Sequence, residues 1–266
     1  MASLTLNNDE IHLWQCRPQE INTAELLARY QALLTDEEKQ KQQRYRFAKD
    51  RHDALITRAF IRDCLSHYAD IDAHQWRFEK GEKDKPEILN PPLPLRFNIS
   101  HTENLIICAI MLNEDIGCDV ENISRNNDVM NIAERYFSST ETRELFSLPK
   151  EQQRSRFFDY WTLKESYIKA WGLGLAIPLG DFSFHIQPGK DRHVNSAIHL
   201  SFAPHRIDYP EIWRHWLFYP SEEHRIALSV RSQTNNQKRD YKLRYFTSIP
   251  LIEMTEIKSL SSLNGG

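Results

Sequence analysis

The chain has 266 residues, of which 40% are hydrophobic, so it is long enough for two compact lobes with a sizeable core. Its formal net charge of −3 excludes the global basic field that nucleic-acid-binding proteins use, although local basic clusters can still bind a phosphorylated ligand. The four cysteines form no C-x-x-C pair, which argues against a zinc site or a redox motif. No window has the length and apolarity of a signal peptide or a membrane span, so we expect a soluble cytoplasmic protein.

The first part of the chain predicts a strand followed by helices. Residues 10–16 alternate as a strand does, and residues 23–34 have a helical pattern that Thr23 is suited to cap. Residues 51–67 predict an amphipathic helix that carries Arg58 on its apolar face. An arginine in that position needs a partner, and a structural ion pair between lobes is the simplest interpretation.

A pair of strands is predicted next. Residues 96–111 read as strand, turn and strand, with the polar turn at Ser100-His101-Thr102. Residues 105–111 are nearly all apolar, which is typical of a strand that is buried on both faces. Residues 115–123 predict another short strand.

Helix-then-strand patterning recurs in the second half. Helical patterns cover 129–147 and 151–171, and strand-like runs follow at 181–187, 196–202, 212–219, 224–231 and 241–246, with a polar linker at 232–240. We therefore predict an α+β fold of two similar lobes. The predicted division is a first lobe at 1–113, a second lobe at 114–246 and a C-terminal tail at 247–266, of which we expect residues 259–266 to be frayed.

Carboxylates suited to a hard cation occur in two of these elements. Asp119 and Glu121 are two residues apart on a strand, so they project to one face, where a solvated strand end is the simplest interpretation. Glu165 lies on a helix that is apolar nearly all round, so it points into the protein or a cleft. Either Lys169, at i+4, is its internal ion-pair partner, or Glu165 faces a metal and Lys169 faces a phosphate. The three carboxylates together suit Mg²⁺.

Basic clusters could supply the phosphate side of such a site. One consists of Lys80, Lys83 and Lys85, and another of Lys39, Lys41, Arg44 and Arg46. Each cluster alone is more often a solvated face. Beside a magnesium-type carboxylate set, they favour a multiply phosphorylated ligand.

Three segments resemble one known family in order and spacing. Phe97–His101 is similar to its FNISH segment, Ile116–Glu121 to its (I/V)G-x-D-(I/V)-E segment, and Trp161–Ala170 to its W-x-x-K-E-(A/S)-x-x-K segment. Phe137-Ser138 with Glu141 and the turn at residues 172–175 also fit. The chain thus resembles the 4′-phosphopantetheinyl transferases of the long, surfactin-synthetase-activating class, from about residue 36 to residue 187.

The resemblance implies an α+β fold of two pseudo-symmetric lobes in a monomeric chain, each a small antiparallel sheet packed with helices, with the active site in the cleft between them. Coenzyme A would bind in that cleft, and its phosphopantetheine arm would be transferred to a serine of an apo acyl or peptidyl carrier protein, releasing 3′,5′-ADP. The residues implied for the 3′-phosphate and adenosine end are Lys41, Lys80, Lys85, Ser100 and His101. Those implied for Mg²⁺ are Asp119, Glu121 and Glu165. Glu165 would take the serine proton, and Lys169 would sit near the pyrophosphate.

One departure and two rival functions remain. The family has Gly-Lys-Pro where this chain has Asp84-Lys85-Pro86, which places the contact of Lys85 in doubt. A non-catalytic module that binds coenzyme A or a carrier protein would be favoured by loss of a metal carboxylate, and none is missing. An unrelated magnesium-dependent nucleotide hydrolase would need a phosphate-binding loop of the G-x-x-x-x-G-K-[ST] type, which the chain lacks. For carrier docking, the segment after Glu121 is the candidate, with Met130 and Arg135 facing outward.

Overall fold

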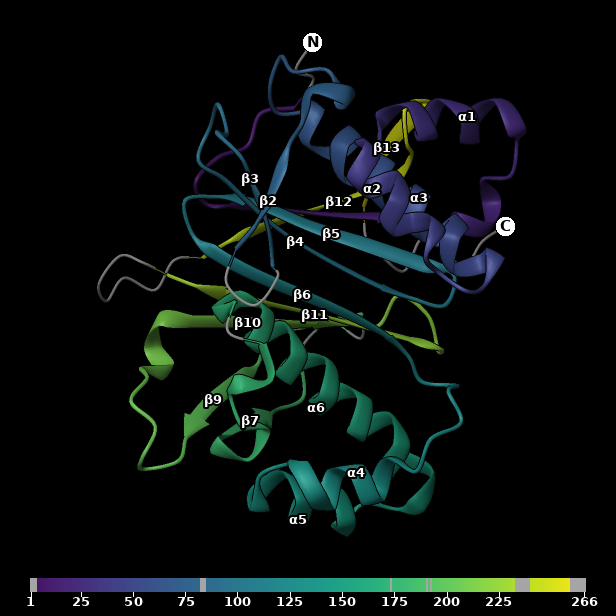
Figure 1. Cartoon of the computed structure of the whole chain (residues 1–266). Helices are drawn as coiled ribbons and strands as arrows, with labels where there is room; N and C mark the ends of the chain where they lie inside the picture. Colours follow the sequence, from purple (N-terminus) through teal and green to yellow (C-terminus); the bar gives the residue numbers. More distant parts are fainter. Residues whose placement is uncertain are drawn as a thin grey trace.

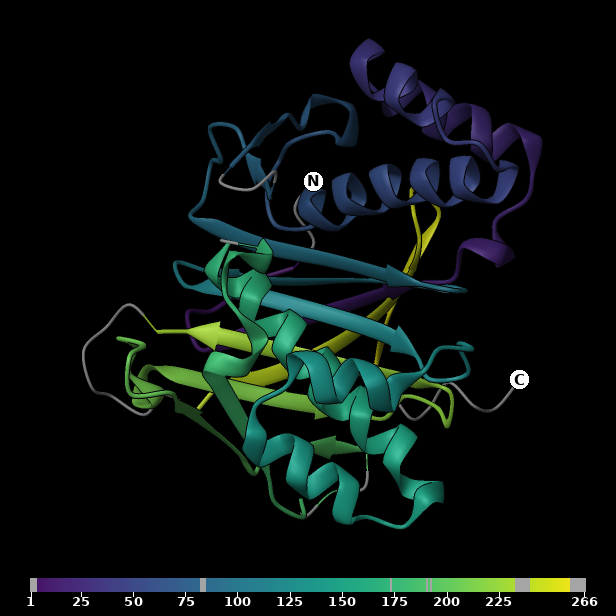
Figure 2. The same cartoon turned by 60° about the horizontal axis from the view of Figure 1, so that its bottom comes forward.

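The structure, a computed structural model, describes residues 4–81, 85–172, 174–189, 191, 193–232 and 240–258. Two sheets lie face to face in the middle of the molecule, and helices cover their outer faces (Figures 1 and 2). The strand order of the first sheet is β13-β12-β1-β5-β4, and that of the second is β6-β11-β10-β8. These strands span Glu10–Cys16 (β1), Leu95–Thr102 (β4), Leu105–Leu112 (β5), Asp115–Asn122 (β6), Val194–Asn195 (β8), Trp213–Phe218 (β10), His224–Arg231 (β11), Lys242–Ile249 (β12) and Glu253–Ile257 (β13).

Each sheet has its own set of covering elements. The first carries α1 (Ala24–Leu33), α2 (Asp36–Gln43) and α3 (Ala48–Ser66), beside a short hairpin of β2 (Phe78–Lys80) and β3 (Pro86–Ile88). The second carries α4 (Val129–Tyr136), α5 (Ser139–Ser147), α6 (Lys150–Trp171) and a two-stranded sheet of β7 (Phe182–Ile186) and β9 (Ile198–Phe202). The α+β class predicted from the sequence is confirmed.

Strand β5 shows how the layers are built. Its side chains alternate between two cores, so that Ile106, Cys108 and Ile110 pack toward the helices of the first sheet, while Leu105, Ile107 and Ala109 pack against the second sheet. The prediction that this strand is buried on both faces is confirmed. Burial of this kind removes roughly 25 cal/mol of unfavourable hydration per Å² of apolar surface, which holds the two sheets together.

The last strands of the chain return to the first sheet. The strand predicted at 241–246 is β12, which pairs in parallel with β1 from Glu10 opposite Lys242 onward. We had placed it in the second lobe, and residues from 247 in a tail; instead they complete β12 and form β13. Trp14 stacks on Phe246 with ring centroids 4.5 Å apart, so apolar burial favours this return. The division at residues 113 and 114 stays a prediction. Residues 259–266, for which we predicted a frayed end, and most of the predicted linker at 232–240 lie outside the described residues.

Two helical predictions had different outcomes. The pattern over 129–147 is divided into α4 and α5, because Ser138 begins a new helix with a capping box: its side chain accepts from the amide of Glu141, and the Glu141 carboxylate accepts from the amide of Ser138. The helix predicted at 151–171 is confirmed as α6, which ends at Gly172 with a φ of +75°. None of the helices in the described part of the chain is long and apolar enough to cross a bilayer.

Candidate active site

The candidate site lies where the edge strands of the two sheets meet. Strand β4 lines up with β6 through its side chains, because alternate residues of β4 accept hydrogen bonds from alternate backbone amides of β6. The pairs are Asn98 with Cys118 at 2.8 Å, Ser100 with Val120 at 3.4 Å and Thr102 with Asn122 at 3.2 Å. The predicted turn at Ser100-His101-Thr102 was therefore wrong: β4 runs to Thr102, and the turn is made by residues 103 and 104, where Asn104 has a φ of +64°. The polar side chains that suggested a turn are the ones that bind the amides of β6, and we call this line of contact between β4 and β6 the seam.

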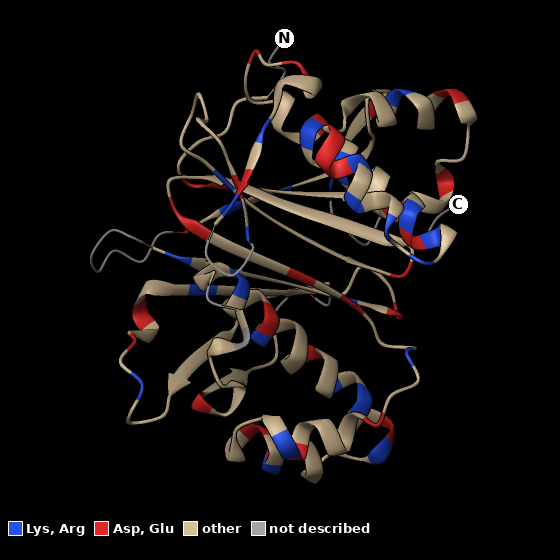
Figure 3. Cartoon of the chain, viewed as in Figure 1, with Lys and Arg blue, Asp and Glu red and all other residues tan. Residues whose placement is uncertain are grey.

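Gly117 allows strand β6 to pack directly against helix α6, which carries Glu165 and Lys169. A Cβ atom built on Gly117 would lie 2.0 Å from the carbonyl oxygen of Ser166 and 2.3 Å from the backbone nitrogen of Ala170. Only glycine permits this approach of strand and helix. Because side chains alternate along a strand, Asp119 and Glu121 face α6 as Gly117 does. Figure 3 shows the acidic residues of the chain in red, and several of them lie along β6.

Asp119 is at the centre of the site. One of its oxygens, Oδ1, accepts from the Lys169 ammonium at 2.6 Å and from the Ser100 hydroxyl at 2.9 Å, and Lys169 also donates to Ser100 at 2.8 Å. Its other oxygen, Oδ2, is buried and has no hydrogen-bond partner among the described residues. Burial lowers the pKa of Lys169, but the carboxylate of Asp119 more than offsets this and raises it overall. Lys169 therefore stays a cation beside Asp119.

Glu121 is oriented by two residues that the sequence analysis did not single out. The Arg125 guanidinium donates to one carboxylate oxygen at 2.9 Å, and the indole of Trp161 donates to the other at 3.2 Å. Burial, with a further contribution from the charge of Asp119, raises the pKa of Glu121 to about 7. The i,i+4 spacing of Glu121 and Arg125 was a visible signal for the first contact.

Glu165 is half-buried, and no described residue donates a hydrogen bond to its carboxylate. Burial first, and then the charge of Asp119, raise its pKa to about 7. Lys169 interacts with it only through space, since the Lys169 ammonium is hydrogen-bonded to Asp119. Of the two interpretations open for Glu165, the closed internal pair with Lys169 is therefore not what the structure shows.

Lys164, next to Glu165 in the sequence, points the other way. Its ammonium lies 2.8 Å from the carboxylate of Glu141 and donates to the carbonyls of Leu179 and Phe182 at 2.7 Å, and both members of the ion pair are fully buried. This pair ties α6 to α5 and to the start of β7. Lys164 thus has a structural role within its own lobe.

Three of the five residues implied for the nucleotide end of the ligand line two neighbouring hollows of the first lobe, which share Arg58 and Pro86. One, of about 570 Å³, contains His101 and is closed on one side by Arg125 of the second lobe. The other, of about 660 Å³, contains Lys41 and Lys80. Burial and the nearby Lys169 lower the pKa of His101.

Arg58 has its partner within the same lobe. Its Nε lies 3.9 Å from Glu38 on α2, and Arg62 binds the other oxygen of Glu38 at 2.7 Å. The expected ion pair between lobes was therefore wrong, because α2, the helix that directly precedes α3 in the chain, was the nearer source of a carboxylate.

Lys85 and Ser100 lie apart from these hollows. The Ser100 hydroxyl contacts Asp119 and Lys169, whereas the Lys85 ammonium donates to the backbone carbonyl of Lys169 at 2.9 Å. Lys83 and Asp84, which the sequence analysis also named, lie outside the described residues. The ligand roles of all these residues stay predictions.

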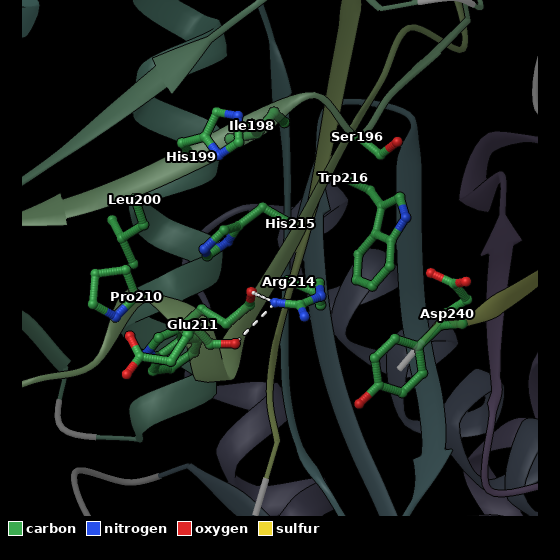
Figure 4. A pocket seen from close by; sticks show the side chains of 12 residues that line it. Ser196, Ile198, His199, Leu200, Pro210, Glu211, Arg214, His215, Trp216 and Asp240 are labelled. Atoms are coloured by element: carbon green, nitrogen blue, oxygen red, sulfur yellow. Dashed lines mark hydrogen bonds between the residues drawn. The ribbon is translucent and has the colours of Figure 1, made fainter. Parts of the chain in front are cut away.

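A further hollow of about 540 Å³ lies on the second lobe, between β9 and β10 (Figure 4). Its wall includes His199, His215 and Trp216, and on one side Arg214 donates to the carbonyls of Glu211 and Trp213 at 3.0 Å and 2.6 Å. None of the predicted site residues lines it. Within the described ranges, moreover, no three His, Cys, Asp or Glu side chains are grouped as a ready metal site.

Known proteins match the chain over both sheets. A family model described as 4′-phosphopantetheinyl transferase superfamily covers residues 115–229, and one described as 4′-phosphopantetheinyl transferase, N-terminal, covers residues 14–112. The 4′-phosphopantetheinyl transferase HetI of Nostoc sp. is 35% identical over 73% of this chain and 82% of its own length, and Sfp of Bacillus subtilis is 33% identical over 69% and 80%. The holo-[acyl-carrier-protein] synthase of Thermotoga maritima is 22% identical over 46% of this chain and 66% of its own, with a TM-score of 0.36. The chain belongs to the 4′-phosphopantetheinyl transferase superfamily.

Proposed function

We propose that this transferase moves the 4′-phosphopantetheine group of coenzyme A to a serine of an apo acyl or peptidyl carrier protein and releases 3′,5′-ADP. The observation that carries the proposal is the environment of Asp119: one carboxylate oxygen is bound by Lys169 and Ser100, and the other is buried with no donor. A buried carboxylate oxygen without a partner is costly unless a cation or a ligand group completes it. The relatives named as phosphopantetheinyl transferases support the same reaction.

The donor set fits magnesium. Asp119 offers its unpartnered oxygen, and Glu121 and Glu165 each carry a pKa of about 7 that the charge of Asp119 helps to raise. A carboxylate that raises the pKa of two neighbouring carboxylates in this way favours a divalent cation between them. We assign Mg²⁺ to these three residues; when bound, it neutralises charge on the pyrophosphate of the ligand.

Glu165 is the proposed general base. Its carboxylate receives no hydrogen bond from a described residue, so it is available to a ligand, and a pKa of about 7 is matched to a proton acceptor that works near neutral pH. Glu121 has a similar pKa, but Arg125 and Trp161 already bind both of its oxygens. Lys169, held by Asp119 and Ser100, then offsets the charge on the departing phosphate.

Coenzyme A would extend from this centre into the two hollows of the first lobe. His101 and Arg125 stand in the hollow that reaches the second lobe, and Lys41 and Lys80 stand in the other. Cationic side chains in these positions suit the 3′-phosphate and the nucleotide end of the ligand. A monomer would suffice, since both sheets of the seam come from one chain.

The carrier protein would dock on α4 and the segment before it. Arg135 is exposed there, with its guanidinium over the ring of Tyr136 at 5.3 Å, and Tyr136 is 46% exposed. Met130, which we expected to face outward, is partly buried against the core of its lobe, so the apolar contact passes to Tyr136. A cation beside an exposed aromatic ring suits an acidic carrier surface.

Intact-mass analysis tests the proposal. The protein is incubated with coenzyme A, Mg²⁺ and a panel of apo carrier proteins, and a mass gain of one phosphopantetheine group on any carrier supports it. Glu165→Gln should abolish the gain, whereas Glu151→Gln, at the exposed start of the same helix, should retain it. A binding module would bind coenzyme A and modify no carrier in the panel, and that result would overturn transfer.

A further inference from the structure

Lys85 lies immediately before the second strand of a hairpin. The hairpin of β2 and β3 is closed at its end by a hydrogen bond from the amide of Gly81 to the carbonyl of Lys85, at 2.8 Å. Lys85 directly precedes β3, and its backbone is fixed by this contact. Its side chain leaves the hairpin and crosses to the other half of the molecule.

The side chain ends on the last turn of α6. The Lys85 ammonium donates to the carbonyl oxygen of Lys169 at 2.9 Å and lies 3.5 Å from the carbonyl oxygen of Ile116 on β6. A Cβ atom built on Gly172, the left-handed residue that ends α6, would lie 3.5 Å from the Cδ of Lys85. The aliphatic stem of Lys85 thus lies along the end of the helix, and its cation reaches both α6 and β6.

This contact satisfies a requirement of the helix. The last four carbonyls of a helix have no partner within it, and they carry the negative end of the helix dipole. The carbonyl of Ile168 accepts from the amide of Gly172, and that of Lys169 accepts from Lys85. A lysine is well suited to this position because it supplies both a donor and a positive charge.

The same contact separates Lys85 from the ligand hollows. Lys41 and Lys80 line one of them, and His101 lines the other, but Lys85 lines neither. It lines a small hollow of about 50 Å³, which is too small for a nucleotide. Burial, as the main cause, lowers the pKa of Lys85, as expected for an ammonium that is withdrawn from water.

From this geometry we propose that Lys85 is a positioning residue: it clamps the backbone of Lys169 against β6 from the first lobe and thereby sets where the Lys169 ammonium stands beside Asp119 and Ser100. The inference rests on the proposed transfer reaction. It differs from the role that the resemblance implies for Lys85, which is contact with the adenosine end of coenzyme A. The two roles make opposite predictions for binding and for turnover.

Lys85→Met tests the proposal, since methionine keeps an unbranched stem and the backbone but removes the cation. We expect kcat for transfer to fall about tenfold, because a misplaced catalytic group lowers the rate more than binding. The Kd for coenzyme A, measured by calorimetry, and its ratio to the Kd for dephospho-coenzyme A should stay within about twofold of wild type. Hydrogen exchange at the amides that end α6 should quicken.

Two variants serve as controls. Lys85→Arg keeps a cation with several donors, and it should recover most of the lost kcat; if it is no better than Lys85→Met, the clamp is refuted. Lys80→Met, on the same hairpin, should instead raise the Kd for coenzyme A, which is the opposite of the result expected for Lys85→Met. An unchanged kcat in Lys85→Met, or a lost preference for coenzyme A over its dephospho form, would overturn the proposal. Failure of the proposed function itself is distinguishable, because the wild-type protein would then transfer nothing.

Discussion

Replacing Gly117 by alanine should separate β6 from α6. The added Cβ would meet the Ser166 carbonyl oxygen at 2.0 Å and the Ala170 nitrogen at 2.3 Å, and contacts below 3.0 Å between such atoms do not occur. Both contacts are to helix backbone, so no side chain can rotate away, and strand and helix must move apart by about 1 Å. Overpacking of this kind typically costs about 1–3 kcal/mol, and backbone contacts on this scale place Gly117→Ala at about 3 kcal/mol.

Urea unfolding of the two proteins measures this cost, and Gly180→Ala is the matched control. A Cβ on Gly180 would meet its nearest atoms at 3.7 Å and 3.8 Å, which is ordinary contact, so its free energy of unfolding should change by no more than about 0.5 kcal/mol. Transfer should also fall in folded Gly117→Ala, since Asp119 lies two residues along the same strand. The reasoning is refuted if Gly117→Ala unfolds within about 1 kcal/mol of wild type.

Three further outcomes are expected. His101→Ala should remove most of the roughly tenfold to hundredfold preference for coenzyme A over dephospho-coenzyme A, as measured by calorimetry; equal discrimination in the variant would place the 3′-phosphate elsewhere. Arg135→Glu should raise the KM for carrier protein and weaken its dependence on salt while leaving the Kd for coenzyme A unchanged, and an unaltered KM would move the docking surface off α4. Burial lowers the pKa of His215 to about 3, below its value of 6.5 in the unfolded chain, so protonation favours unfolding and stability is lost as pH falls below 6.5. When the pH falls from 6.5 to about 5, this residue should lower the free energy of unfolding of the wild type by about 2 kcal/mol. The free energy of unfolding of His215→Gln should fall by less over the same range, as measured by urea titrations at both pH values.

Local pattern was sufficient where one element determines the outcome. The all-round apolar character of α6 predicted that Glu165 points inward, and the spacing of two residues on a strand predicted that Asp119 and Glu121 share a face. Both statements depend only on the period of a helix or a strand, which the sequence displays directly. The capping box of Ser138 and Glu141 was equally visible and divides the helical pattern that we took as one.

The pairing of distant strands could not be predicted from local sequence patterns. The strand over 242–249 has an ordinary strand pattern, and nothing in that pattern indicates that its neighbour is β1, more than two hundred residues earlier. The polar run from Asn98 to Thr102 suggested a turn for the same reason: its alternating hydrogen-bond acceptors have meaning only once β6 lies beside them. The pairing of strands that are distant in the sequence becomes evident only in the folded structure.

The segment that carries the strongest resemblance divides its positions between holding the helix and working at the site. Lys164 and Lys169 are five residues apart on α6, so they face different sides of it. Lys164 forms a fully buried ion pair within its own lobe, and this pair fixes the rotation of α6 about its axis. That rotation presents Lys169 to Asp119 and leaves the Glu165 carboxylate without a hydrogen-bond donor from the described part of the chain. The two lysines of the motif therefore have different roles: Lys164 fixes the helix in place, and Lys169, positioned by that helix, acts at the seam between the sheets.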